Sequence, residues 1–204
     1  MNDKRLFAPS TARNREAILD VLRKILPTTG LALELASGAG EHVTFFAAAF
    51  PDLTFCPSDP SAEARESIAA WIAAAGAANV CAPLPLDVER FPWPVSAADA
   101  MICINMIHIS PWSATVSLFE GARCALPGNA PLYLYGPYRR GGAHTAPSNA
   151  EFDASLRARN ADWGVRDLEE VARVARGKGF GDPQVVEMPA NNLSVIFRRS
   201  FEAA

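Results

Sequence analysis

Residues 31–46 have the sequence LALELASGAGEHVTFF, and this stretch decides the fold. Its apolar start, residues 31–35, has the length and composition of a short buried strand. Small residues at 36–40 lead into a second segment, which we expect to be a helix over 41–50 that Pro51 ends, because proline cannot continue a helix. The stretch therefore predicts a strand, a glycine loop and a helix in succession.

The same alternation continues along the chain. We expect further strands at 53–56, 80–86, 98–105 and 131–135, and helices at 62–75 and 113–126. A first helix precedes Pro27, with Ser10 or Thr11 as a possible cap. Helices between consecutive strands make those strands parallel and cover both faces of the sheet. The pattern predicts a doubly wound α/β fold.

Two details concern the edges of this sheet. Pro83 and Pro85 place residues 80–86 at a sheet edge, because proline has no N–H to donate to a neighbouring strand. In the last third we expect a long loop over 136–149, helices at 150–159 and 166–178, and a terminal antiparallel hairpin of 184–188 and 193–200. The length of the loop predicts a mobile lid over a pocket.

Composition limits the class of protein. The chain has 204 residues, of which 50% are hydrophobic and 20% charged, with a net charge of −3. These values indicate one compact domain over residues 1–204, with an N-terminal helix within 1–27 and an insertion at 136–165, and they disfavour a nucleic-acid partner. The absence of an apolar run long enough to span a membrane and of a secretory signal predicts a soluble, cytoplasmic protein. No metal site is predicted, and Cys56, Cys81, Cys103 and Cys124 are expected to be reduced core residues.

Acidic side chains occur at three successive strand ends. Glu34 lies in the first strand, Asp59 follows the second, and Asp87 follows the third. Ligands of open parallel sheets bind outside the carboxyl ends of the strands, so these acids are expected to face a ligand beside the glycine loop, where Gly38 and Gly40 let it approach the backbone. The alternatives are that Asp59 caps a helix, that Asp87 starts a turn and that the glycines only make a tight turn.

The charge of these residues discriminates between cofactors. A dinucleotide fingerprint requires a small residue three positions after its second glycine, where this chain has Val43. Three acids would also repel a pyrophosphate, whereas S-adenosylmethionine carries an ammonium, a sulfonium and a ribose diol. The pattern favours S-adenosylmethionine, and a nicotinamide-dependent reductase is the third-ranked hypothesis.

Three segments resemble motifs I, II and III of class I S-adenosylmethionine-dependent methyltransferases, namely residues 34–40, 59–61 and 86–88. Four more resemble a methyltransferase-like family of unknown function (domain of unknown function 938) found in bacteria and animals: residues 105–112, 135–138, 144–149 and 189–192. The resemblance implies a seven-stranded Rossmann-like sheet of order 3-2-1-4-5-7-6, with strand 7 antiparallel. The chain departs from motif I at Ala36, where glycine is usual.

The resemblance also implies which residues hold the cofactor and which face the methyl acceptor. The cofactor residues would be Glu34, Ala36, Ser37, Gly38, Gly40, Asp59, Asp87 and Asn105. On the acceptor side we expect Asn105, Tyr138 and His108, the last as a candidate general base because histidine titrates near neutrality. A packed core histidine is a nearly equal alternative. Tyr135, Arg139, Arg140 and His144 could contact an acceptor, and the two arginines favour an anionic one.

The sequence therefore predicts a methyltransferase acting on an unidentified, small-molecule acceptor, with S-adenosylmethionine as cofactor. The second hypothesis is a non-catalytic protein that has the methyltransferase fold and binds either an adenosyl ligand or a partner. The sequence leaves the oligomeric state open.

Overall fold

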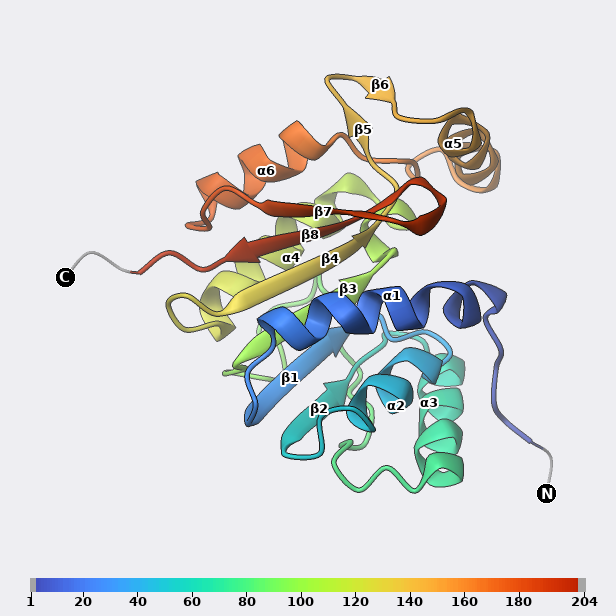
Figure 1. Cartoon of the computed structure of the whole chain (residues 1–204), viewed down its shortest axis with the longest axis vertical. Helices are drawn as coiled ribbons and strands as arrows, with labels where there is room; N and C mark the ends of the chain where they lie inside the picture. The colour runs from blue at the N-terminus through green and yellow to red at the C-terminus, as the bar shows by residue number, and fades with distance from the viewer. Residues whose placement is uncertain (1–2, 202–204) are drawn as a thin grey trace.

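The computed structural model describes residues 3–201, so the predicted outer bounds of the domain, residues 1 and 204, lie outside the described residues. Six strands form one sheet of order β2-β1-β3-β4-β8-β7 (Figure 1). The strands are β1 (Gly30–Leu35), β2 (Leu53–Pro57), β3 (Ala100–Ile104), β4 (Pro131–Gly136), β7 (Gln184–Met188) and β8 (Asn192–Arg198). Strands β1, β2, β3 and β4 are parallel to one another, and β8 runs antiparallel to both β4 and β7.

Helices cover both faces of this sheet, as predicted. One face carries α1 (Pro9–Ile25), α2 (Glu41–Ala47) and α3 (Ala62–Ala75), and the other carries α4 (Trp112–Ala125) and α6 (Leu168–Gly177). Alternation along β1 divides the core, because Ala32 packs with α1 and α2 whereas Leu33 and Leu35 pack with α4. The doubly wound α/β prediction is confirmed.

The expected third strand, residues 80–86, is the main correction to the fold. This segment does lie at the sheet edge beside β2, but it makes only two isolated parallel bridges, Phe55 with Val80 and Ser58 with Leu84. Pro83 and Pro85 supply no N–H groups, so the ladder cannot continue between or beyond these bridges. The sheet therefore has six strands instead of seven, in the predicted order with strand 3 missing.

The first helix begins earlier than predicted. Helix α1 starts at Pro9, with Ala8 at the N-cap and no side-chain capping bond, so Ser10 and Thr11 lie inside the first turn. Proline suits this position because it lacks the N–H that the first turn leaves unpaired. The backbone N–H of Ala8 donates to Oε2 of Glu41, 2.7 Å away, which joins the start of α1 to α2.

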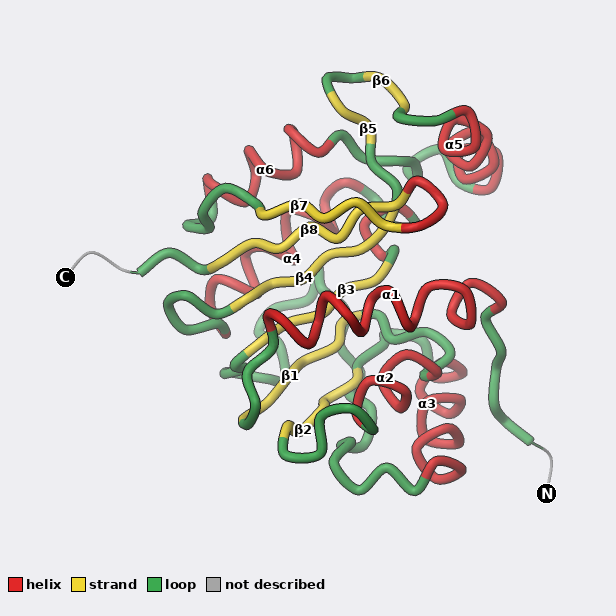
Figure 2. The backbone as a smooth tube through the Cα atoms, viewed as in Figure 1, coloured by secondary structure: helices red, strands yellow, loops and turns green. Residues whose placement is uncertain are grey.

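The segment after β4 is more ordered in structure than the predicted loop. It contains the two-residue strands β5 (Arg139–Arg140) and β6 (Ala143–His144), followed by α5 (Pro147–Arg159). Figure 2 shows β5 and β6 as a small separate hairpin beyond the main sheet. The predicted long loop over 136–149 therefore contains a short hairpin, and α5 begins three residues earlier than the predicted helix at 150, whereas the predicted mobility stays a prediction.

Two further sequence predictions concern the cysteines and membranes. All four cysteines are free, but only Cys56 and Cys103 are buried, whereas Cys81 and Cys124 are exposed, so the core prediction holds for two of them. Within residues 3–201, no helix combines the length and the apolar character needed to cross a membrane.

The carboxyl ends of the parallel strands share one edge of the sheet. Figure 1 shows the first turn of α1, helix α5 and the turn between β7 and β8 at this same edge, on the right of the view. That turn is the short helix η2 (Pro189–Asn191), and a second short helix, η1 (Met106–His108), follows β3. Segments from the whole chain therefore surround the expected ligand site.

Close packing at the end of β4 makes a prediction about stability. A Cβ atom added to Gly136 would overlap the His108 ring, with Cδ2 at 2.6 Å, and His108 is fully buried. We expect Gly136→Ala to lower the free energy of unfolding by about 1–3 kcal/mol, or Tm by roughly 3–10 °C, because the ring has no space to move into. Calorimetry would measure the change. Gly177→Ala is the control, since its Cβ would contact nothing within 4 Å, and an equal Tm in both variants would contradict the packing argument.

Candidate functional site

The two glycines of the loop between β1 and α2 have different surroundings. Gly38 and Gly40 both have positive φ angles, +58° and +93°. A Cβ on Gly40 would lie 2.7 Å from the Cα of Ile68 in α3, so glycine is required there by helix packing. A Cβ on Gly38 would contact nothing within 4 Å. The two glycines were predicted to serve a ligand together, but only Gly38 borders open space.

Ala36 occupies the position where motif I usually has glycine. Its φ angle is +53°, in the left-handed region that costs a residue with a Cβ about 1–2 kcal/mol. The loop therefore keeps the backbone shape of a glycine at this position.

Glu34 has a buried carboxyl group with an unpaired oxygen. The residue is only 2% exposed, and Oε2 has no hydrogen-bond partner among the described residues. Burial raises the pKa of this carboxyl to about 7, while a hydrogen bond from Ser37 opposes the rise. An unpartnered buried carboxyl is costly, so this oxygen is suited to receive a donor or cation from a ligand.

Asp59 ties the end of β2 to the glycine loop. Its Oδ2 accepts from the backbone N–H of Gly38 at 3.0 Å, and its Oδ1 accepts from Ser61 N–H at 2.9 Å. The N-cap of α3 is Ser61, whose Oγ accepts from Ala64 N–H. Asp59 is thus not the helix cap that the sequence left open as an alternative. It lies directly beside the open side of the loop.

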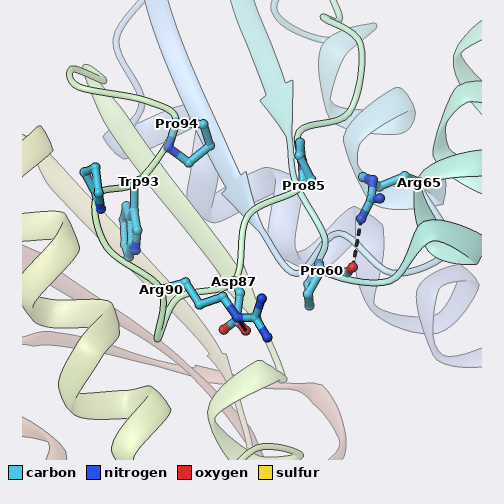
Figure 3. Close-up of a pocket in the computed structure, with 8 residues that line it drawn as sticks. Pro60, Arg65, Pro85, Asp87, Arg90, Trp93 and Pro94 are labelled. Carbon is cyan, nitrogen blue, oxygen red and sulfur yellow. Dashed lines mark hydrogen bonds and ion pairs between the residues drawn. The ribbon is translucent and has the colours of Figure 1, made fainter.

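Asp87 borders a hollow of about 550 Å³, which Pro60 and Trp93 also line. Figure 3 shows Asp87 next to Arg90 at one end of this hollow, opposite Pro85, and their ion pair has a separation of 3.3 Å. The Asp87 carboxylate also accepts from the Glu89 N–H at 3.0 Å, which is the turn predicted as its alternative role. The turn role is therefore present, and the ligand role of Asp87 stays a prediction.

Asn105 lines a second hollow, of about 610 Å³, which we call the Asn105 pocket. Its walls come from the first turns of α1, the ends of β3 and β4, helix α5 and the turn between β7 and β8: Ser10, Arg13, Asn14, Asn105, Ile109, Tyr135, Pro137, Ser148, Asn149, Phe152, Ala190, Asn191 and Asn192. Asn105 has a φ of +63°, and its N–H donates to the carbonyl of Tyr135 at 2.8 Å. Strand β1 lies between β2 and β3 in the sheet, so the glycine loop after β1 lies between the strand ends that Asp59 and Asn105 follow.

His108 and Tyr138 lie outside the wall of this pocket. Both are 0% exposed, and their rings pack edge to face with centroids 5.1 Å apart. Burial and the nearby Arg166 lower the pKa of His108 to about 3, so the ring is neutral near pH 7. Its Nδ1 accepts from the backbone N–H of Arg166 at 3.4 Å. The packed histidine that the sequence left open is the arrangement that the structure shows.

The cations predicted to face an acceptor also lie elsewhere. Arg140 pairs with Glu187 at 3.8 Å, and His144 contacts Asp153 at 3.6 Å. Arg139 N–H donates to the carbonyl of Arg166, so β5 is attached to the chain segment before α6. None of the three belongs to the wall of the Asn105 pocket as the described residues form it. The cation on that wall is Arg13, which the sequence reasoning did not single out.

A chain of polar side chains, His42, Asn14 and Tyr135, reaches the wall of the Asn105 pocket, and the sequence reasoning singled out only Tyr135 of the three. Nε2 of His42 lies 2.9 Å from Oδ1 of Asn14, and Asn14 hydrogen-bonds the side chain of Tyr135. Burial lowers the pKa of His42 to about 4, so it is neutral, and its proton must be on Nε2 because an amide oxygen only accepts. The amide nitrogen of Asn14 then donates to Tyr135, which leaves the tyrosine proton free to point elsewhere. The available signal was Asn14 itself, a polar residue four positions before the buried Ile18 on one helix face.

Comparison with known families gives one match over most of the chain. The family model described as "Protein of unknown function (DUF938)" matches residues 5–199.

The fold is similar to solved structures of methyltransferases. A putative O-methyltransferase from Nostoc punctiforme has a TM-score of 0.81 at 15% identity, over 93% of this chain and 56% of that one. An O-methyltransferase family 2 protein from Planctomyces limnophilus, in complex with apigenin, has a TM-score of 0.77 at 18% identity, over 91% and 56%. A methyltransferase of calicheamicin biosynthesis, in its SAH-bound form, has 0.74 at 16%, over 94% and 54%. This chain thus spans little more than half of each, and these identities show a methyltransferase-like fold alone.

The two loop glycines make a matched pair of predictions for the unliganded protein. We expect Gly40→Ala to lower the free energy of unfolding by several kcal/mol, because backbone strain adds to the overlap with Ile68. Gly38→Ala should cost only about 1–2 kcal/mol, the strain alone. Chemical denaturation would measure both. A larger loss for Gly38→Ala would mean that the open space beside Gly38 is absent in solution.

The buried Glu34 carboxyl predicts a dependence of stability on pH. Its pKa is about 7 in the folded chain and near the ordinary 4.5 when unfolded. Between these two pH values the unfolded chain has lost the proton that the folded chain keeps. The contribution of Glu34 to the free energy of unfolding is therefore greatest below pH 4.5 and decreases as the pH rises to 7. Glu34→Gln should flatten this part of the profile, and the two proteins should differ at pH 8 by an amount on the order of a few kcal/mol. Denaturation from pH 5 to 8 would test it, and parallel profiles would refute the shift.

Proposed function

We propose that this chain, which belongs to the family of proteins of unknown function DUF938, is an S-adenosylmethionine-dependent methyltransferase acting on a small-molecule acceptor. The observation that carries the proposal is the open space at Gly38, the proposed ligand cradle, with Asp59 bonded to its N–H, together with the unpaired buried oxygen of Glu34 in the strand that leads into this loop. The methyltransferase-like fold supports the same assignment.

The residues at the cradle fit the chemical groups of S-adenosylmethionine. The buried Oε2 of Glu34 lacks a partner within residues 3–201, and an ammonium group would supply one. Asp59 offers carboxylate oxygens to the ribose hydroxyls, and Asp87 can accept from an exocyclic amine at the hollow lined by Pro60 and Trp93. Ala36 and Ser37 would contribute the backbone between these acids.

The cofactor would supply a methyl group already activated on a sulfonium. This chain's own contribution is then to bind and orient the two partners, which accounts for much of the rate in such transfers. In this proposal Asn105 faces both ligands, since it follows β3 and lines the Asn105 pocket. Tyr135 donates a hydrogen bond into the pocket, held by Asn14 and His42. His108 and Tyr138 support Asn105 from behind, as positioning residues.

One observation keeps the non-catalytic alternative in view. His108, the predicted general base, is enclosed and has a pKa of about 3, so it is not placed to accept a proton from an acceptor. An adenosyl-binding protein without transfer activity would need no base. A methyltransferase whose acceptor is already deprotonated would also need none, so turnover decides between these functions.

The location is part of the proposal. All four cysteines are free thiols, which fits a reducing compartment such as the cytoplasm.

Ligand binding tests the cofactor assignment. We expect S-adenosylhomocysteine at a hundred times its Kd to stabilise the fold by about 2.7 kcal/mol, or to raise Tm by roughly 5–10 °C, and NADH to have no such effect. Asp59→Asn should weaken this binding by about tenfold or more, because a charged acceptor is lost. Calorimetric titration would measure both, with the exposed Asp52→Asn as control. A response to NADH alone, or equal affinities in both variants, would refute the assignment.

Turnover separates the enzyme from a binding protein. Formation of S-adenosylhomocysteine in the presence of a library of small acceptors would support the methyltransferase. Tight binding with no product across that library would favour the non-catalytic alternative.

A further inference from the structure

The Asn105 pocket has one charged residue on its wall. Arg13 carries that charge, and the other lining residues are neutral, including five asparagines. The pocket therefore has a local positive charge in a protein whose net charge is −3. A ligand with one negative charge would be attracted to it, whereas a cation would be repelled.

The Arg13 guanidinium is available to a ligand. Arg13 is exposed, and within the part of the chain that the structure describes no carboxylate pairs with it. Arg23, on the same helix, differs because it pairs with Asp20 at 3.3 Å. Five N–H donors in a planar fork match the two oxygens of a carboxylate, and such pairs are stronger than neutral hydrogen bonds.

Part of the wall of the Asn105 pocket is apolar. Phe152 of α5 and Ile109, after η1, are 39% and 43% exposed, which places them among the few large hydrophobic side chains that the described residues leave accessible. Pro137 lines the pocket with them. Covering such side chains with a ligand would be favourable, at about 25 cal/mol for each Å² of apolar surface.

Some polar side chains of the pocket wall bond to other parts of the protein, and others remain available to a ligand. The amide nitrogen of Asn149 donates to Thr145 and to the carbonyl of Asn191, and that of Asn192 donates to Pro189 and Ala190, so these groups hold α5 and the β7–β8 turn. On the α1 side, the hydroxyl of Tyr135 keeps its proton free because Asn14 donates to it. The Arg13 guanidinium and the Tyr135 hydroxyl are therefore among the donors of the wall that a ligand can use.

We infer that the Asn105 pocket binds a small monocarboxylate with an apolar body, its carboxylate paired with Arg13 and its body against Phe152 and Ile109. The inference rests on the proposed function, because it names the class of acceptor that this methyltransferase would take. It also replaces the predicted role of Arg139 and Arg140, which lie outside this pocket.

Four probes with one ring system test the charge preference on the full chain. They are 2-naphthoate, the neutral 2-naphthamide, 2-naphthylmethylammonium and 2-naphthyl phosphate. Ligand-observed NMR titrations, with and without S-adenosylhomocysteine, would give each Kd. We expect 2-naphthoate to bind about tenfold more tightly than the amide or the ammonium, because a hydrogen bond to a charged partner is worth at least that factor. Equal affinities for naphthoate and naphthamide, or tighter binding of the phosphate, would overturn the inference.

Variants assign the preference to particular side chains. Arg13→Gln should weaken 2-naphthoate about tenfold and leave 2-naphthamide unchanged, and Arg13→Lys should restore part of the loss. Arg23→Gln removes the same charge from the same helix outside the pocket, so it should change neither Kd. Phe152→Ala should weaken both probes by a similar factor. An equal loss in Arg13→Gln and Arg23→Gln would contradict a specific pair.

Titration of S-adenosylhomocysteine into the same variants separates this inference from the proposed function. If the wild-type chain binds naphthoate through Arg13 but does not bind S-adenosylhomocysteine, the carboxylate site stands and the methyltransferase proposal fails. If Arg13→Gln weakens S-adenosylhomocysteine and spares naphthoate, Arg13 serves the cofactor and the inference is wrong.

Discussion

The burial of β1 and β3 on both faces is the constraint on which the rest of the structure depends. Leu33, Leu35, Met101 and Ile102 are 0% exposed, because helices cover the sheet from both sides. Strands in this position cannot present polar groups along their length, so the polar residues collect where the strands end. Glu34 is the exception, and its raised pKa is the cost of placing a carboxyl inside such a strand. In the proposed function, a donor group of the ligand offsets that cost.

The glycine loop that we propose as the ligand cradle is held in shape by contacts within the protein. Asp59 holds the Gly38 N–H, and Gly40 allows the loop to pack against Ile68 of α3. The strained φ of Ala36 persists because its neighbours in the loop are held at both ends. Residues that would contact a cofactor therefore also shape the loop, which is why a motif of small residues serves packing and binding together.

The Asn105 pocket is assembled differently, from segments distant in the chain. Helix α1, the ends of β3 and β4, helix α5 and the β7–β8 turn each contribute a part of its wall. Arg166 helps to hold this assembly, because its guanidinium donates to the carbonyls of Ile107 and Ser110 and so joins the segment before α6 to η1.

The sequence by itself determined the alternation of strands and helices, the glycine loop and the edge position of residues 80–86, because these follow from local signals: apolar runs, small residues and prolines. The order of the strands was implied by the resemblance to class I methyltransferases and not by any local signal. The sequence also indicated the acids at the strand ends. It could not place His108 and Tyr138 in the core, since an apolar neighbourhood is compatible with either a packed or a pocket-facing ring. Only the tertiary structure brought Arg13, Asn14 and Tyr135 together. Their proximity depends on how α1 crosses the sheet, which is a long-range packing outcome that no spacing within one segment encodes.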